Sequence, residues 1–171
     1  MKKIVFMVAF VLLFATGCTP ANENQKLGIA RYAAHGKNAF AVTTVIMNGD
    51  VIGEAIIDEY QYMAGENIKC VPNAETAFSV FEGDDMKCLI SKRENNEFYS
   101  KQMTDKGGAT NTLLDGYQTI ENFAKGKTIA ELESAIQNKS SEEVVDAISG
   151  ATLVDAKGYI ESIIVAAKNA K

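Results

Sequence analysis

The sequence contains a single histidine, His35, set between Ala34 and Gly36. One histidine excludes zinc sites built from several histidines, and any Ser-His-Asp hydrolase would have to work through His35. The chain also lacks a Walker loop and a Gly-x-Gly-x-x-Gly turn, so nothing in it indicates nucleotide hydrolysis or hydride exchange with NAD. The glycine-flanked context favours a solvated loop position for His35. We therefore predict no catalytic residue and no metal ligand.

Positive charge is scarce, because 17 Lys and Arg residues stand against 22 Asp and Glu residues and the net charge is −5. An acidic domain repels the phosphate backbone of nucleic acids, so nucleic-acid partners are disfavoured. The basic residues, among them Lys87, Lys92 and Arg93, are scattered or stand in short groups. This pattern indicates that these residues lie on solvated faces and do not form a continuous surface for binding nucleic acid.

The longest apolar run, residues 4–15, is too short to span a bilayer, which takes about 20 residues. It follows two lysines and leads into Ala15-Thr16-Gly17-Cys18, an arrangement typical of a secretory signal. The last four residues resemble a bacterial lipobox, in which residues 1–17 are removed and Cys18 receives acyl chains such as palmitate. Several acyl chains hold a protein stably at a membrane. The alternative is an ordinary signal peptide with an incidental cysteine.

On the lipoprotein interpretation, residues 18–27 are the lipidated cysteine and a flexible polar tether. Residues 28–171 then form one domain that faces outside the cytoplasm and is anchored at the cell membrane. The 154 residues left after processing suffice for one ordinary domain, and no repeat or change of composition divides them.

Two cysteines remain after lipidation, Cys70 and Cys88. Their spacing excludes a Cys-x-x-Cys redox centre. An oxidising exterior favours a disulfide between them, and the alternative is a pair of buried thiols that act as small apolar side chains.

Two strand pairs are expected in the first half of the domain. Residues 39–47 and 51–58 are rich in β-branched and aromatic side chains, and Asn48-Gly49 between them is a strong hairpin signal. Residues 76–81 and 86–91, joined through residues 82–85, form a second candidate pair. The sequence therefore predicts an antiparallel sheet.

The second half of the domain has helical periodicity. Leu113, Tyr117, Ile120 and Ala124 share one face, and Gly126 is placed to end that helix. A capping box at Thr128 and Glu131 begins a further helix that turns Ile129, Leu132 and Ile136 inward. The last helix, residues 155–170, carries an apolar face formed by Ala156, Ile160, Ile163, Ile164 and Ala167. Strands followed by helices predict an α+β fold with the helices on one side of a small antiparallel sheet.

The most informative segment is Asp146-Ala147-Ile148-Ser149-Gly150-Ala151-Thr152, just before the last helix. Backbone N–H groups and the helix dipole favour a phosphate group at such a position. Gly150 allows close backbone approach, Ala151 keeps the surface uncrowded, and Ser149 could donate a hydrogen bond to a phosphate oxygen.

The pattern Asp-x-x-Ser-Gly-Ala-Thr resembles, at every fixed position, the motif of the FMN-binding domain family. The resemblance implies that FMN is joined through its phosphate to Thr152, by a separate flavin transferase that uses FAD as donor. A covalent cofactor is kept even where free FMN is scarce. Asp146 would position the segment, or bind the transferase or its metal. The alternative is a glycine-containing turn in which Thr152 or Asp155 caps the helix.

The likeness extends from about Gly28 to the end of the chain and is greatest to the small single-domain lipoprotein branch, the major membrane immunogens. It is carried by Asn48-Gly49-Asp50, Asp58-Glu59-Tyr60-Gln61-Tyr62-Met63, Val71-Pro72-Asn73, Ser91-Lys92-Arg93, Gly126-Lys127-Thr128 and Glu131-Leu132-Glu133. Among these matching segments, the resemblance implies that Tyr60, Gln61 and Met63 are candidates for a pocket that holds the flavin ring. Their alternative role is that of ordinary residues at a strand end.

A second Gly-Ala-Thr occurs in residues 105–110, but Gly107 stands where Ser or Thr belongs and Asp105 has the wrong offset. We expect a loop there and not an attachment site at Thr110.

These observations favour a lipid-anchored electron carrier, which passes electrons between a membrane reductase and an external acceptor or partner flavoprotein. It would not be a complete enzyme by itself. One alternative is a surface lipoprotein without flavin that binds a ligand or partner. Another is a sensor or regulator of a membrane complex.

Overall fold

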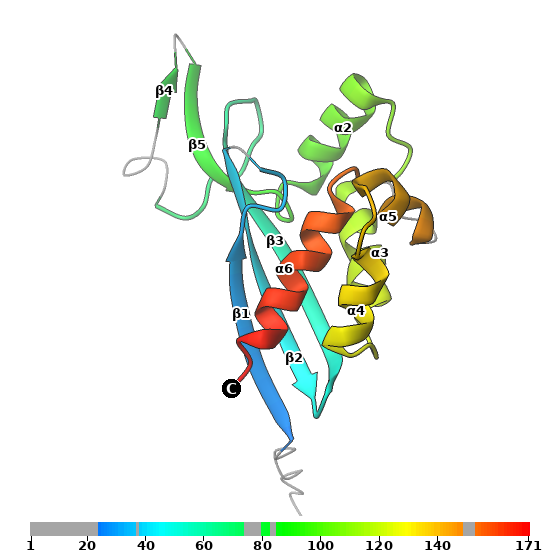
Figure 1. The fold of residues 1–171 in the computed structure, drawn as a ribbon. Helices are drawn as coiled ribbons and strands as arrows, with labels where there is room; N and C mark the ends of the chain where they lie inside the picture. Colours follow the sequence, from blue (N-terminus) through cyan, green and yellow to red (C-terminus); the bar gives the residue numbers. More distant parts are fainter. Residues whose placement is uncertain (1–23, 37, 74–79, 83–84, 149–152) are drawn as a thin grey trace, which may run out of the picture.

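An antiparallel sheet covered on one face by helices forms the domain (Figure 1). The computed structural model describes residues 24–36, 38–73, 80–82, 85–148 and 153–171. The strands lie in the order β1-β2-β3-β5-β4, and every neighbouring pair is antiparallel. The predicted α+β architecture is confirmed.

Within the described residues, the elements follow one another as five strands and then five helices. The strands are β1 (Gln25–Tyr32), β2 (Ala39–Asn48), β3 (Val51–Met63), β4 (Val80–Glu82) and β5 (Asp85–Ser91). The helices are α2 (Asn96–Gly107), α3 (Leu113–Ala124), α4 (Ile129–Ile136), α5 (Ser141–Ala147) and α6 (Ala156–Lys168).

The β2–β3 hairpin is the centre of the sheet and confirms the predicted pair. Asn48 pairs with Val51 across the turn, and Gly49 adopts φ +61°, a conformation that glycine takes without steric cost. The strand β3 continues five residues beyond the predicted end and pairs with β5 from Tyr60 to Met63. The second predicted pair is confirmed for β4 and β5, while residues 74–79 lie outside the described part of the chain.

The strand β1 corrects the prediction for residues 25–27, which were assigned to the tether. They are the beginning of β1, which pairs with β2 from Gln25 to Tyr32. Their side chains are exposed at the sheet edge, so their composition resembles that of a linker. The predicted signal peptide, Cys18 and the first part of the tether lie outside the described residues. Within the described ranges, no helix is long and apolar enough to span a bilayer.

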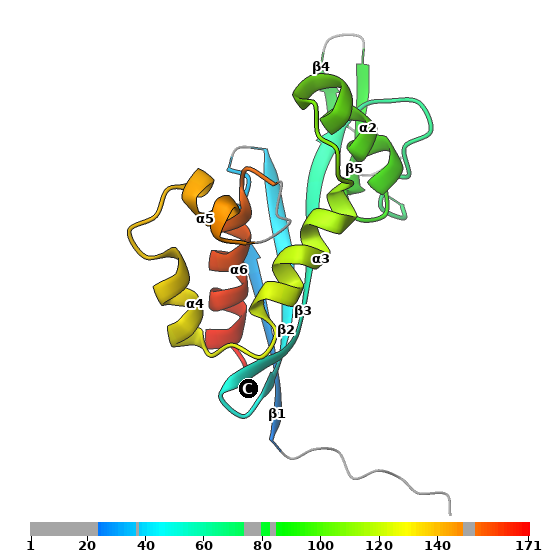
Figure 2. The same cartoon turned by 90° about the vertical axis from the view of Figure 1, so that its right-hand side faces the viewer.

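The helices form two layers on one face of the sheet (Figure 2). The helix α6 lies across β1, β2 and β3, and α3 packs on β3, while α4 and α5 pack on α6. All five predicted apolar residues of α6 are buried there. The predicted helices at α3 and α4 are confirmed, and Thr128 and Glu131 form the predicted capping box.

The helices α2 and α5 were not predicted. None of the twelve residues of α2, all within the described part of the chain, is fully buried. It therefore lacks the apolar stripe that identifies a helix in sequence. The short α5 buries only Val144 among its described residues, but it begins with a capping box of Ser140 and Glu143 that could have revealed it.

Gly28 allows α6 to lie close to β1. A methyl group added at Gly28 would sit 1.9 Å from the carbonyl oxygen of Ala166. We expect Gly28→Ala to lower the free energy of unfolding by about 1–3 kcal/mol, because α6 must shift away from the strand. Urea denaturation would measure the loss.

A matched control is Gly107→Ala at the end of α2, where the added methyl group meets nothing within 4 Å. Alanine favours a helix over glycine by up to about 1 kcal/mol, so this variant should be as stable as the parent or slightly more stable. Equal losses for the two variants would contradict the close approach at Gly28.

Candidate functional site

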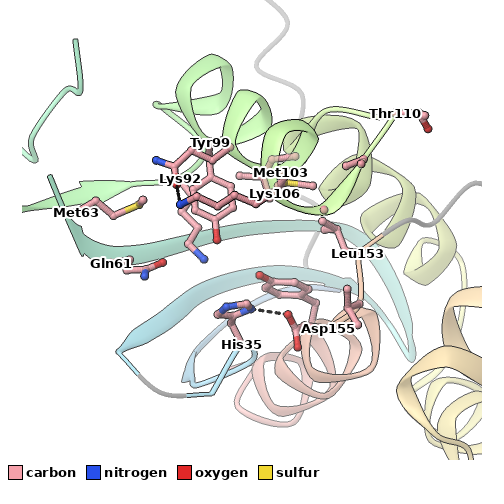
Figure 3. A pocket seen from close by; sticks show the side chains of 17 residues that line it. His35, Gln61, Met63, Lys92, Tyr99, Met103, Lys106, Thr110, Leu153 and Asp155 are labelled. Atoms are coloured by element: carbon pink, nitrogen blue, oxygen red, sulfur yellow. Dashed lines mark hydrogen bonds and ion pairs between the residues drawn. The ribbon is translucent and has the colours of Figure 1, made fainter. Parts of the chain in front are cut away.

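A pocket of about 660 Å³ lies where the end of β3, the helix α2 and the start of α6 meet (Figure 3). Its volume is within the range of small-molecule and cofactor sites, about 300–1,000 Å³. Its walls are largely apolar and come from β3, α2, the start of α3 and the segment before α6. They include Met63, Tyr99, Met103, Leu113 and Leu153.

A buried polar network forms one side of the pocket. The ammonium of Lys92 donates a hydrogen bond to Oε2 of Glu59 at 2.5 Å, and the Tyr159 hydroxyl donates to the same oxygen at 2.9 Å. The side chains of Lys92 and Glu59 are 1% and 0% exposed. Lys92 also lies 4.4 Å from the centre of the Tyr99 ring. Burial raises the pKa of Tyr159, so its hydroxyl stays protonated and acts as a donor.

The expectation that Lys92 and Arg93 lie on solvated faces was wrong. Lys92 is paired with Glu59, and Arg93 forms an ion pair with Glu121 of α3 and donates to the carbonyl of Ile57 at 2.8 Å. Their carboxylate partners are distant in sequence, and a lysine-arginine pair gives no local sign of them.

A histidine–carboxylate pair lies at the edge of the same pocket. Nδ1 of His35 is 2.5 Å from Oδ2 of Asp155, and the two side chains are 42% and 35% exposed. Asp155 occupies the N-cap position of α6, but within the described residues its side chain makes no capping bond. Its carboxylate is turned to His35, which lies in the exposed loop that the sequence predicted but is paired there with a residue of α6.

The hydrogen bond that the imidazole donates to Asp155 is the main cause that raises the pKa of His35. Burial and the charge of Lys92 lower that pKa, while the charges of Asp155 and Glu59 raise it. With the net shift upward, the pair stabilises the fold fully below the ordinary histidine pKa of about 6.5. This stabilisation is lost as the pH rises through the folded-state pKa.

The loop that carries His35 is fixed on α6. A methyl group at Gly158 would lie 2.4 Å from the carbonyl oxygen of Ala34, so loop and helix are in close contact. The Tyr32 hydroxyl donates to Glu161 of α6 at 2.8 Å. These contacts hold the imidazole at the pocket.

The structure separates the three residues that were predicted to form a ring pocket. Gln61 and Met63 line the pocket, on the face of β3 that also carries Glu59. Tyr60 points to the opposite face and stacks on Phe40, with ring centres 5.7 Å apart. Neighbouring strand residues face opposite sides of a sheet, so a patch of consecutive residues cannot line one pocket.

Gln61 also presents an unused acceptor. Its Oε1 atom is buried and has no hydrogen-bond partner within the part of the chain that the structure describes. A buried acceptor without a partner is uncommon in proteins, so this atom is available to a donor that enters the pocket.

The structure describes the residues on either side of the Ser-Gly-Ala-Thr part of the motif. Asp146 is exposed near the end of α5. Leu153, the first residue after the motif, is buried and lines the pocket, with its side chain against Gly116 of α3. Ser149, Gly150, Ala151 and Thr152 lie outside the described residues.

The second Gly-Ala-Thr borders the same pocket. Gly108 ends α2 in the left-handed conformation, with φ +67°, and Thr110 lies in the loop that leads to α3. Residues 108–110 form the predicted loop, while residues 105–107 belong to the last turn of α2, and residues 107–110 contribute to the pocket lining.

Cys70 and Cys88 form a disulfide, with their Cα atoms 5.7 Å apart. This selects one of the two states that the sequence left open. Cys88 lies in β5 opposite Met63, so the disulfide joins the segment after β3 to the strand beside the pocket.

No protein-family model, curated protein or solved structure matches the chain.

Proposed function

We propose that this protein carries FMN, joined covalently through its phosphate to Thr152, and acts as an electron carrier outside the cytoplasm. The observation that carries the proposal is the complete seven-residue motif, followed directly by Leu153 in the wall of a cofactor-sized pocket. A flavin attached at residue 152 is one residue away from that wall. A separate flavin transferase would attach it, with FAD as donor.

The pocket residues suit a flavin ring. Flavin rings favour apolar or aromatic walls with a few polar groups near the ring nitrogens. Tyr99, Met103 and Leu153 supply such walls and exclude water. The free Oε1 of Gln61 can accept a hydrogen bond from a ring N–H group, which would satisfy a buried atom that otherwise lacks a partner. Bound FMN would supply reversible transfer of one or two electrons.

The protein itself contributes rigid, charged side chains beside the pocket. The hydrogen bonds among Lys92, Glu59 and Tyr159 hold one side of the pocket rigidly, because all three side chains are buried. Val154 is 68% exposed beside the pocket and offers an apolar contact to a redox partner. The partners would be a membrane reductase and an external acceptor, and acyl chains on Cys18 would hold the protein at the membrane beside them.

The decisive experiment compares the two Gly-Ala-Thr threonines. The full chain is co-expressed with an active flavin transferase and exported, and the processed protein is examined by intact mass and by flavin fluorescence in a denaturing gel. Wild-type protein and Thr110→Val should carry one covalent FMN, whereas Thr152→Val should carry none. An unmodified wild-type mass would rule the proposal out.

One alternative is a surface lipoprotein that binds a small ligand without covalent flavin. The same pocket favours it, because the Oε1 atom of Gln61, which has no partner among the described residues, can accept a hydrogen bond from any ligand that carries a donor. It predicts an unmodified mass together with a small molecule released on denaturation.

A further inference from the structure

The pocket gathers cationic side chains in an acidic protein. The chain has a net charge of −5, yet among the residues that the structure describes, Lys92, Lys106 and His35 line this pocket together with one acidic side chain, Asp155. Glu59 lies behind Lys92 and pairs with it. With His35 neutral, the two lysines balance the two carboxylates, and with His35 protonated the group has one excess positive charge.

His35 is the member of this group whose charge changes near neutral pH. Lys92 is held by Glu59, and the ammonium of Lys106 donates to Gln102 at 2.8 Å. The His35 side chain rises from the β1–β2 loop toward the pocket and meets Asp155 there (Figure 3). It is 42% exposed, so protons from solvent can reach it.

We propose that His35 takes up a proton when the group bound in the pocket gains negative charge, and that it thereby couples electron transfer to pH. This inference rests on the proposed flavin function. Asp155 is the positioning residue, because its carboxylate holds Nδ1 of the imidazole and leaves the second ring nitrogen to exchange protons.

In a two-electron step, the protons that are taken up partly offset the charge of the two electrons. Two electrons from the reductase and one proton from solvent reduce the flavin to its singly protonated anion, which adds one negative charge to the pocket. His35 then takes up a second proton from solvent and becomes imidazolium, paired with Asp155. When the acceptor removes the two electrons, both protons return to solvent.

Reduction of the flavin and protonation of His35 favour each other. A negative charge in the pocket favours the protonated imidazole, and by linkage a protonated imidazole favours the reduced flavin to the same extent. A unit charge about 8 Å away, partly screened by water, raises a pKa by roughly 0.5. Tyr159 and Lys92 face the same side of the pocket, and both are bonded to Glu59 behind them.

The test uses the one histidine as an unambiguous NMR probe. The pKa of His35 is measured in the flavinylated wild-type protein, in the oxidised state and after reduction with dithionite under anaerobic conditions. We expect a higher pKa in the reduced state, by roughly 0.5. Between the two pKa values, potentiometry should find more than one proton taken up per two electrons.

Two variants separate this coupling from a structural role. His35→Gln should reduce the uptake to one proton per two electrons, and Asp155→Asn should lower the pKa of His35 in both redox states. A flavinylated protein whose His35 pKa is the same in both states would overturn the inference and leave the proposed function standing. An intact mass without FMN would overturn both.

Discussion

Glu59→Gln is expected to lower the free energy of unfolding by about 3–5 kcal/mol, the usual cost of removing one partner of a buried ion pair. The substitution keeps the size of the side chain but removes the charge that faces Lys92. The ammonium of Lys92 is 1% exposed and cannot reach water without moving the surrounding elements. Chemical denaturation followed by circular dichroism would measure the loss.

A double variant shows whether the unpaired charge is the cause. In Glu59→Gln/Lys92→Met the remaining cation is also gone, so most of the stability should return. The exposed pair of Lys69 and Glu94, 2.9 Å apart, supplies the control, because Glu94→Gln should change stability by less than about 1 kcal/mol. If the double variant were as unstable as Glu59→Gln alone, the buried pair would not be the source of the effect.

The same network connects stability to the pocket. Glu59 is one of the charges that raise the pKa of His35, while Lys92 opposes it. Glu59→Gln therefore changes the electrostatic surroundings of His35 as well as the fold. Since Gln61 and Met63 follow Glu59 on the same face of β3, the network also holds the strand segment that lines the pocket.

The elements that sequence predicts are those whose signals are local. Asn48-Gly49 determines a hairpin by itself, and the apolar face of α6 recurs at helical spacing over the whole helix. The edge strand β1 and the peripheral helix α2 bury little surface, so their residues are not under the constraint that produces such patterns. Their conformation is determined by neighbours that a sequence window does not contain.

The site was only partly predicted, because many of its contacts join residues that are distant in the sequence. Gln61 and Met63 line the pocket and Tyr60 lies on the opposite face of the strand, a separation that the alternation of strand faces could have predicted. Lys92 was wrongly assigned to solvent, and the pairing of the exposed His35 was not predicted, because the partners of both residues are distant in the chain. Asp155 is 120 positions from His35, and Glu59 is 33 positions from Lys92. Only the fold brings these charges together.

Removing the disulfide is expected to lower the free energy of unfolding by about 2–4 kcal/mol, the usual effect of a loop of this size. Cys70 and Cys88 are 18 residues apart, and the bond restricts the unfolded chain between them. In the folded protein the bond adds to the hydrogen bond from the Val71 N–H to the carbonyl of Leu89, which is 2.8 Å long. The double variant Cys70→Ala/Cys88→Ala should show the loss in urea denaturation.

The variant alone does not isolate the covalent bond, because Cys88 is buried and alanine also removes packing there. Reduction of the wild-type protein supplies the missing comparison. A reductant should lower the stability of the wild-type protein nearly to that of the double variant and leave the variant unchanged. Because Cys88 pairs with Met63, reduction should also increase hydrogen exchange at the end of β3. A wild-type protein that resists unfolding equally with and without reductant would show that the two cysteines contribute through packing and not through their bond.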